Sequence, residues 1–149
     1  MVTNLTTPLI RDLAEGRVES LDVVDWSDPV VAGLGFDAHS EYVEMFWLPV
    51  LGPTATWLLR RLVRAVRTAE PIDGPSTAAE LGIGWETGRI NPFLRALQRL
   101  DRFGLVRTEG DRLAVRTMVP PIASRQMQRL PEHLRRAHPA WVSASRSAA

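Results

Sequence analysis

The stretch that decides the fold of this chain runs from Ser76 to Thr117 and reads STAAELGIGWETGRINPFLRALQRLDRFGLVRTEGDRLAVRT. Serine accepts hydrogen bonds from the first-turn amides of a helix, so Ser76 predicts a short helix over about residues 77–81. Gly82 and Gly84 follow at once and favour a turn, because glycine commonly terminates helices. The stretch therefore opens with a short capped helix and a glycine-broken turn.

A second helix is predicted to begin at Asn91 and Pro92. Asparagine caps helices, and proline suits the first helical position, where its missing amide would have had no partner. Apolar residues then recur at intervals of three and four, and arginines occupy the rest of the circumference. The apolar set is Phe93, Leu94, Leu97, Leu100 and Phe103, and the arginines are Arg95, Arg99 and Arg102. We expect one side of this helix to face the core and the other to be cationic.

A β-hairpin is predicted directly after that helix. Gly104 suits a left-handed cap, and residues 105–108 and 112–117 are two short alternating runs joined across residues 109–111. Helix, broken turn, second helix and hairpin is the order of a winged helix-turn-helix, in which the second helix enters the major groove of DNA. The predicted fold is mainly α with a small β-hairpin wing, an α+β winged helix-turn-helix with extra N- and C-terminal helices.

Two segments of the stretch carry a family resemblance. TAAEL at 77–81 and LRALQRLDRFGLV at 94–106 resemble the heart of the winged-helix transcriptional regulators, notably the multiple-antibiotic-resistance and arsenic-responsive repressor families. A shorter run, LPVLGPTATWLL at 48–59, is similar to the first helix of primosomal winged-helix proteins that help load replicative helicases. The resemblance implies binding of double-stranded DNA by a homodimer, although winged helices also serve as protein-docking modules.

The residues predicted to contact DNA lie on the second helix, in the turn before it and in the wing. Arginine suits bidentate contacts with guanine and with phosphate. The set in and around the helix is Thr87, Arg89, Asn91, Arg95, Arg99 and Arg102, and the wing contributes Arg107 and Arg112, which the resemblance places on flanking phosphates or in the minor groove. Trp85 is interpreted as a core plug in the turn.

The charges are segregated along the chain. Residues 1–40 hold seven acids against two arginines, a net charge of −5, whereas the remaining 109 residues hold ten acids against sixteen arginines, a net charge of +6. We interpret residues 1–40 as an acidic, partly ordered arm with a short helix near residues 8–15, residues 41–120 as the winged-helix domain, and residues 121–149 as a C-terminal helical extension with a frayed tail. The arm either packs its apolar residues on the body, or competes with DNA for the basic surface, or docks on a partner.

The segment 41–67 is the longest apolar-patterned tract. Ser40 is predicted to cap a helix over residues 41–48, which Pro49 ends or kinks, and Gly52 and Pro53 restart a helix. The restarted helix is assigned an apolar face of Ala55, Leu58, Leu59, Leu62, Val63 and Val66 and an opposite arc of Arg60, Arg61, Arg64 and Arg67. The aromatic residues Tyr42, Phe46, Trp47 and Trp57 stand at helical spacing beside leucines, which predicts core or dimer contacts rather than a base-stacking platform.

The C-terminal part is predicted to contain a helix over residues 122–130, broken by Pro131, a further turn or two over residues 131–137, and a small polar tail from Ser143. Helices after a wing commonly form dimers, and packing across their own domain is equally compatible with this pattern. These helices and the aromatic segment 42–47 are the candidate surfaces for a protein partner.

The sequence offers little for catalysis or for a cofactor. There is no cysteine, the three histidines lack the spacing of metal ligands on one helix face, and neither a phosphate-cradling glycine loop nor Gly-x-Ser-x-Gly occurs. No apolar run approaches a membrane span, and the N-terminus lacks a secretory pattern. We expect a cytoplasmic DNA-binding protein that is not an enzyme and has no cofactor or metal. The alternatives are a winged-helix adaptor in a replication or transcription complex and a repressor that responds to a small molecule.

Overall fold

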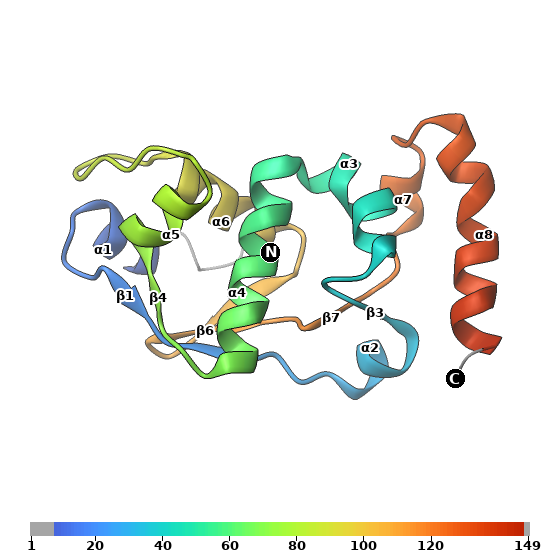
Figure 1. Cartoon of the computed structure of the whole chain (residues 1–149), viewed down its shortest axis with the longest axis horizontal. Helices are drawn as coiled ribbons and strands as arrows, with labels where there is room; N and C mark the ends of the chain where they lie inside the picture. Colours follow the sequence, from blue (N-terminus) through green and yellow to red (C-terminus); the bar gives the residue numbers. More distant parts are fainter. Residues whose placement is uncertain (1–7, 148–149) are drawn as a thin grey trace.

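Two helices, α4 (Pro53–Thr68) and α6 (Pro92–Arg102), pack against each other in the computed structural model, which describes residues 8–147 (Figure 1). Within that range the protein is α+β, with eight α-helices, one π-helical segment and seven short strands. The other elements are α1 (Pro8–Ala14), β1 (Ser20–Leu21), β2 (Val23–Asp25), α2 (Pro29–Leu34), β3 (Phe36–Asp37), η1 (Val43–Trp47), α3 (Leu48–Leu51), β4 (Ile72–Asp73), α5 (Gly74–Glu80), β5 (Val106–Glu109), β6 (Arg112–Val115), β7 (Met118–Val119), α7 (Ser124–Met127) and α8 (Glu132–Ser147). The α+β class expected from the sequence is confirmed.

Helix α4 begins at Pro53, as the Gly52-Pro53 pair predicts, and its apolar stripe faces the core. The buried apolar residues are Ala55, Leu58, Leu59, Leu62 and Val63, whereas Val66 is half-buried. The helix ends at Thr68 and is capped by Ala69, whose backbone is left-handed (φ 54°). The 3.6-residue period of the sequence therefore predicted this helix and its buried side correctly.

Arg60 departs from the predicted pattern of α4. The sequence places it on the solvent arc, but its relative exposure is 8%. Its guanidinium donates to the Ser40 carbonyl oxygen at 3.1 Å, to the Ala38 carbonyl oxygen at 3.3 Å and to a Glu44 carboxylate oxygen at 2.9 Å. The prediction for Arg60 is wrong because residues 38–44 fold over that side of α4, a contact between segments that periodicity within one helix does not reveal.

The segment before α4 is one continuous helical run. The π-helix η1 passes directly into α3, and the Leu48 amide donates to the Val43 carbonyl oxygen, five residues back. Pro49 lies in the first turn of α3, so it neither ends nor separates the run; the wider π turn accommodates a residue that donates no amide hydrogen bond. The Ser40 side-chain oxygen has no partner among the described residues, so the predicted cap at Ser40 is also wrong.

Helix α5 begins three residues earlier than predicted. Its N-cap is Asp73, whose side chain accepts a hydrogen bond from the Ser76 amide at 2.8 Å. Ser76 therefore lies inside the first turn instead of capping it. Asp73 follows Ile72 in strand β4, and the hydrogen bond to Ser76 lowers the pKa of its carboxyl group. The chain thus passes from strand to helix at one acidic residue.

The predicted β-hairpin is present and directly follows α6. Strands β5 and β6 pair antiparallel, with Val106 opposite Val115 and Glu109 opposite Arg112. Gly110 has a φ of 65° at the tip, a left-handed conformation that glycine adopts without steric cost. Leu113 and Val115 are buried, so one face of the hairpin belongs to the core.

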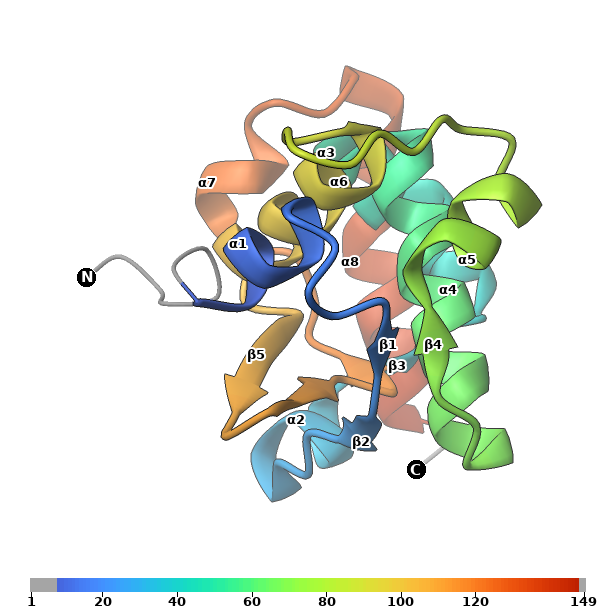
Figure 2. The same cartoon turned by 90° about the vertical axis from the view of Figure 1, so that its left-hand side faces the viewer.

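The N-terminal residues are built into the sheets. Strand β1 pairs antiparallel with β4, and β2 pairs parallel with β6, so the largest sheet has the order β2-β6-β5. Figure 2 shows β1 beside β4, with α1 lying in front of α6. Ile10, Leu13 and Leu21 belong to the same buried cluster as the residues of α4 and α6. Within the predicted acidic arm, residues 8–40 thus contribute to the core, and residues 1–7 lie outside the described range.

The C-terminal part differs from its prediction in both helices. The expected helix over residues 122–130 is limited to α7, and α8 continues from Glu132 through Pro139 to Ser147. Residues 143–147, predicted as a frayed tail, are helical because the Leu134, His138 and Trp141 side chains pack on the body of the protein. Residues 148–149 lie outside the described range.

A buried hydrogen-bond chain holds α8 against η1. The Tyr42 hydroxyl lies 2.7 Å from His138 Nε2 and accepts a hydrogen bond from the Ile122 amide at 2.9 Å. Burial raises the pKa of Tyr42 to about 12 and lowers the pKa of His138. Phe46 and Trp47 are buried beside Tyr42, so these three aromatic residues are core, whereas Trp57 on α4 is 55% exposed.

Candidate nucleic-acid interface

Helix α6 starts as the sequence predicts. The Asn91 side-chain oxygen accepts a hydrogen bond from the Leu94 amide at 3.0 Å, and Pro92 takes the first helical position. The four apolar residues Phe93, Leu94, Leu97 and Leu100 are each 0% exposed. Phe103 is half-buried and follows the last residue of the helix. The core side of α6 is therefore fixed by packing against α4 and by its cap.

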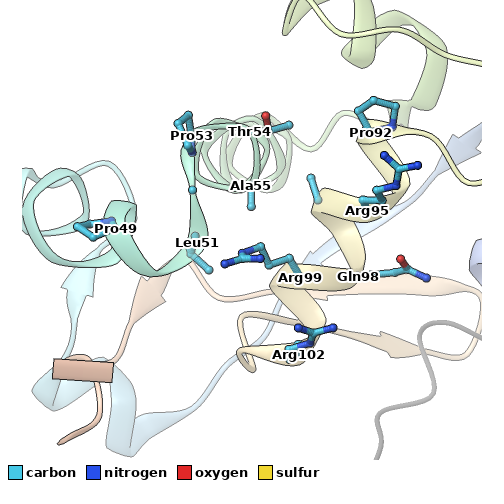
Figure 3. Close-up of a pocket in the computed structure, with 12 residues that line it drawn as sticks. Pro49, Leu51, Pro53, Thr54, Ala55, Pro92, Arg95, Gln98, Arg99 and Arg102 are labelled. Atoms are coloured by element: carbon cyan, nitrogen blue, oxygen red, sulfur yellow. The ribbon is translucent and has the colours of Figure 1, made fainter. Parts of the chain in front are cut away.

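The opposite side of α6 presents a stripe of exposed residues. Pro92, Arg95, Arg99 and Arg102 are spaced by three or four residues and so lie on one side of the helix. They face a groove of about 610 Å³ between α6 and the turn that joins α3 to α4 (Figure 3). The other wall of this groove is formed by Pro49, Leu51, Gly52, Pro53, Thr54 and Ala55. We call this the α4–α6 groove.

Arg99 crosses the α4–α6 groove. Figure 3 shows its side chain reaching from α6 toward Leu51, and its guanidinium donates to the Val50 carbonyl oxygen at 2.9 Å. The guanidinium also lies 5.7 Å from the centre of the Phe103 ring, within the range of a cation–π contact. Two contacts thus restrict a side chain that would otherwise sample many rotamers.

The arginines of the stripe have no acidic partner among the described side chains. Among the described side chains, eight other arginines form ion pairs with carboxylates, but no carboxylate lies within 4.0 Å of the guanidinium nitrogens of Arg95, Arg99 or Arg102. Guanidinium groups only donate hydrogen bonds, so this stripe is a surface of donors and positive charge. Such a surface is suited to anions.

The predicted residues of the turn before α6 lie apart from that stripe. Arg89 is highly exposed and pairs with Glu86 at 3.3 Å, and Thr87 is exposed beside Gly16. Asn91 is only 3% exposed, and its side chain serves as the cap of α6. Trp85 packs its ring 5.4 Å from that of Phe93, consistent with its interpretation as a plug, and is half-buried.

The two predicted wing residues differ in their surroundings. Arg107 pairs with Glu109 at 3.1 Å, and its guanidinium lies 4.3 Å from the centre of the Trp26 ring. Arg112 is exposed at the start of β6 and has no ion pair among the described side chains. Arg112 thus has no ion pair among the described side chains, whereas Arg107 lies over Trp26, the residue that follows β2.

No protein-family model, curated protein or solved structure was found to match this chain. The chemistry of the described residues is therefore the basis for assigning a function. On that basis the α4–α6 groove is distinguished by three arginines without acidic partners.

The sequence did not predict the contacts of Trp26 with two arginines. Its ring lies between two arginines, because Arg116 stacks on it at 3.7 Å from the ring centre and Arg107 at 4.3 Å. Arg116 also donates to the Gly104 carbonyl oxygen at 2.8 Å and pairs with Asp28 at 3.2 Å. Backbone hydrogen bonds from Val31, then the bond from Arg116, lower the pKa of Asp28. The signal in the sequence was a tryptophan among acids, which does not reveal its partners 80 residues or more away.

The described residues offer no obvious catalytic or metal-binding group. Among residues 8–147, no three histidine, aspartate or glutamate side chains are placed to hold a metal ion. No described helix has both the length and the apolar character needed to cross a membrane. The exposed stripe of α6 can donate charge-assisted hydrogen bonds to an anion.

Proposed function

We propose that this chain is a winged helix-turn-helix protein that binds double-stranded DNA with sequence specificity, as a homodimeric, cytoplasmic transcriptional regulator. In this proposal α5, the connection 81–91 and α6 form the helix-turn-helix, and the hairpin β5–β6 is the wing. The order of these elements supports the proposal, because a recognition helix followed at once by a hairpin is the arrangement of that class.

The observation that carries the proposal is the two-sided character of α6. Its core side is fully buried, whereas Arg95, Arg99 and Arg102 are exposed on the other side without acidic partners among the described side chains. Among the other exposed arginines of the described residues, five pair with carboxylates and six do not. Arginines that are left unpaired on the helix before a hairpin suit contacts with phosphates and with guanine edges in the major groove.

The proposed roles follow the position of each residue. Arg95, Arg99 and Arg102 contact bases and phosphates from α6, and Arg112 contacts a flanking phosphate from the wing. Arg89 and Thr87, in the exposed connection before α6, contact the DNA backbone. Arg107 contributes to DNA binding only if it leaves Glu109 and Trp26, so we expect its effect to be smaller than that of Arg112.

The homodimer is supported by exposed apolar residues on α2. Val30 is 69% exposed and Leu34 is 53% exposed, and they lie four residues apart on the same helix. Apolar residues gathered on one surface mark interfaces more often than solvent-facing sites. Sedimentation of the full chain with and without Leu34→Glu measures this part of the proposal: we expect a dimer that the substitution dissociates.

The DNA proposal is tested by equilibrium binding to a pool of duplex DNA across a range of salt concentrations. Replacing Arg95 and Arg99 together by alanine is expected to lower the affinity about 100-fold, because two charge-assisted contacts are lost. The slope of log affinity against log salt should fall by about 0.9 for each phosphate contact that disappears.

A matched pair on the other arginine-bearing helix controls for total charge. Arg61→Ala with Arg64→Ala removes the same two charges from exposed positions of α4 that do not line the α4–α6 groove. If this control weakens binding as much as the α6 pair, binding reflects net charge and not α6. If the α6 pair leaves the affinity unaltered, the recognition-helix assignment is wrong.

A second candidate function, a winged-helix adaptor that binds another protein, is favoured by one observation. Trp57 is 55% exposed on α4 and lies 5.6 Å from the Arg60 guanidinium. In the surfaces that the sequence suggests for a protein partner, Tyr42 and Trp47 of the segment 42–47 are buried, and Trp141 of α8 is half-buried. Trp57→Ala should leave DNA affinity unchanged and abolish partner binding if the adaptor function holds.

A further inference from the structure

The α4–α6 groove combines two kinds of hydrogen-bond donor from distant parts of the chain. Arg95, Arg99 and Arg102 line it from α6, and residues 52–55 line it from the first turn of α4 (Figure 3). The arginines have no acidic partner among the described side chains. One N–H of Arg99 is satisfied by the Val50 carbonyl oxygen, which leaves the remaining donors of that guanidinium directed at the groove.

Among the described residues, the first turn of α4 carries no acid that would offset this charge. No residue of the first turn of α4 is acidic, and Gly52 at the N-cap has no side chain to accept a hydrogen bond. The first hydrogen bond of the helix joins the Thr56 amide to the Gly52 carbonyl oxygen at 3.1 Å, so the Thr54 and Ala55 amides have no acceptor among the described residues. The positive end of the α4 dipole adds to the charge of the three arginines.

The size of the groove limits what it can hold. A volume of about 610 Å³ is typical of sites for small molecules and exceeds what a single phosphate fills. Leu51 and the prolines at 49 and 53 form an apolar part of the wall next to the donors. The groove therefore suits a phosphate group attached to a larger, partly apolar unit, such as a sugar.

We propose that the α4–α6 groove binds a phosphate group, held by the guanidinium groups of Arg95, Arg99 and Arg102 and by the free amides of Thr54 and Ala55. Arg99 is the positioning element, because its contact with Val50 fixes one guanidinium before the ligand arrives. The phosphate belongs either to the DNA backbone, in which case the inference rests on the function proposed above, or to a small phosphorylated molecule.

The test uses a substitution that changes the groove without weakening the fold. Thr54→Glu places a carboxylate in the first turn of α4, where an acid stabilises a helix, and it opposes an anion in the groove. Its thermal midpoint is therefore expected to equal or exceed that of the natural protein. Thr54→Gln controls for the shape of the new side chain, and Arg64→Gln controls for the loss of one unit of charge outside the groove.

Two measurements on the full chain separate the possible sources of the phosphate. Pyrophosphate is titrated while the amide signals of residues 54 and 55 are followed by NMR, and the affinity for a labelled duplex is measured in parallel. We expect pyrophosphate to shift both amides in the natural protein and in the two controls but not in Thr54→Glu. We expect Thr54→Glu to weaken duplex binding about tenfold relative to Thr54→Gln.

The outcomes distinguish the groove from the function proposed above. Shifted amides with a duplex affinity that Thr54→Glu leaves unchanged support the groove as a site for a small phosphorylated molecule. Duplex binding that depends on Arg95 and Arg99, together with unshifted amides and no effect of Thr54→Glu, overturns the groove and leaves DNA binding standing. The absence of both amide shifts and duplex binding overturns both proposals.

Discussion

Helices α4 and α6 carry the same pattern in the sequence and use it differently in the structure. Both have an apolar stripe in the core and arginines on the rest of the circumference. Three of the four arginines of α4 pair with acids from three other elements, Arg60 with Glu44 at 2.9 Å, Arg61 with Glu80 at 3.2 Å and Arg67 with Asp37 at 2.6 Å. Those of α6 have no such pairs among the described side chains.

The difference separates internal from external use of charge. The three paired arginines of α4 fasten η1, α5 and β3 to the central helix, so their charge is largely neutralised within the protein. No described side chain neutralises the arginines of α6, so they stay available to an anionic partner. This difference is contradicted if substitutions of the α4 arginines lower the DNA affinity more than the folding stability. It is equally contradicted if substitutions of the α6 arginines lower the folding stability more than the DNA affinity.

The largest effect on folding is expected from Arg60→Ala. Its guanidinium satisfies two carbonyl oxygens and one carboxylate while it is itself buried. Removing it leaves those acceptors without their donor and opens a cavity, which should lower the free energy of unfolding by about 3 kcal/mol. Chemical denaturation followed by tryptophan fluorescence or circular dichroism measures this loss.

Arg64→Ala is the matched control on the same helix. Arg64 is exposed and has no ion pair among the described side chains, so its replacement should change the free energy of unfolding by less than about 0.5 kcal/mol. Equal losses for the two variants would show that Arg60 is not a structural residue.

Local signals in the sequence predicted the central elements of the fold. The Asn91-Pro92 start of α6, its buried stripe and the hairpin across Gly110 all depend on residues within a few positions of one another. The same holds for the restart of α4 at Gly52 and Pro53. Caps, periods and turn residues act over short distances, so one sequence is enough to predict them.

The cap of α5 at Asp73 was missed locally, but most other errors share one cause, which is contact between distant segments. The burial of Arg60 depends on residues 38–44, and the extent of α8 depends on the packing of His138 against Tyr42. The pairing of β1 with β4 and of β2 with β6 also joins segments far apart in the sequence. Periodicity assigns a side of a helix to the core but does not say which segment covers its other side.

The candidate site was predicted in part for the same reason. The exposure of Arg95, Arg99 and Arg102 follows from the helical period, because they lie opposite the leucines. The groove does not follow from the helical period, because its second wall comes from residues 49–55, about forty positions before α6 in the chain. The sequence also does not show whether Asn91 caps α6 or contacts DNA. Its burial in the structure favours the cap.

A smaller effect, visible in its dependence on pH, is expected from Arg67→Gln. Burial alone would raise the pKa of Asp37, but hydrogen bonds from Arg67 and from the His39 amide, together with the Arg67 charge, lower it below its ordinary value of 3.8. A carboxylate with a lowered pKa stabilises the fold above that ordinary value and loses this contribution as the pH falls through the lowered pKa. The variant should be less stable by about 0.5 kcal/mol at neutral pH, since the pair is partly exposed and screened.

The effect of Arg67→Gln on stability can be measured through its dependence on pH. The difference in unfolding free energy between the natural protein and Arg67→Gln should be largest near pH 7 and shrink as Asp37 is protonated below pH 3.8. Arg95→Gln on α6 has no carboxylate partner among the described side chains, so its difference from the natural protein should not vary over the same range. A pH-dependent difference for Arg95→Gln would place an acid beside α6 and contradict the comparison.

The smallest effect is expected from the exposed pair of Arg61 and Glu80, which joins α4 to α5 at 3.2 Å. The Arg61 and Glu80 side chains are 37% and 53% exposed, so the entropy of holding two long side chains offsets most of the attraction. A double-mutant cycle with Arg61→Gln and Glu80→Gln should give a coupling free energy of about 0.3 kcal/mol that salt reduces further. Neither single variant should change DNA affinity by more than about twofold, because Arg61 stands outside the α4–α6 groove. A coupling free energy as large as the loss of stability in Arg60→Ala would mean that solvent does not screen this ion pair. The distinction between the pair of the buried Arg60 and the pair of Arg61 would then be wrong.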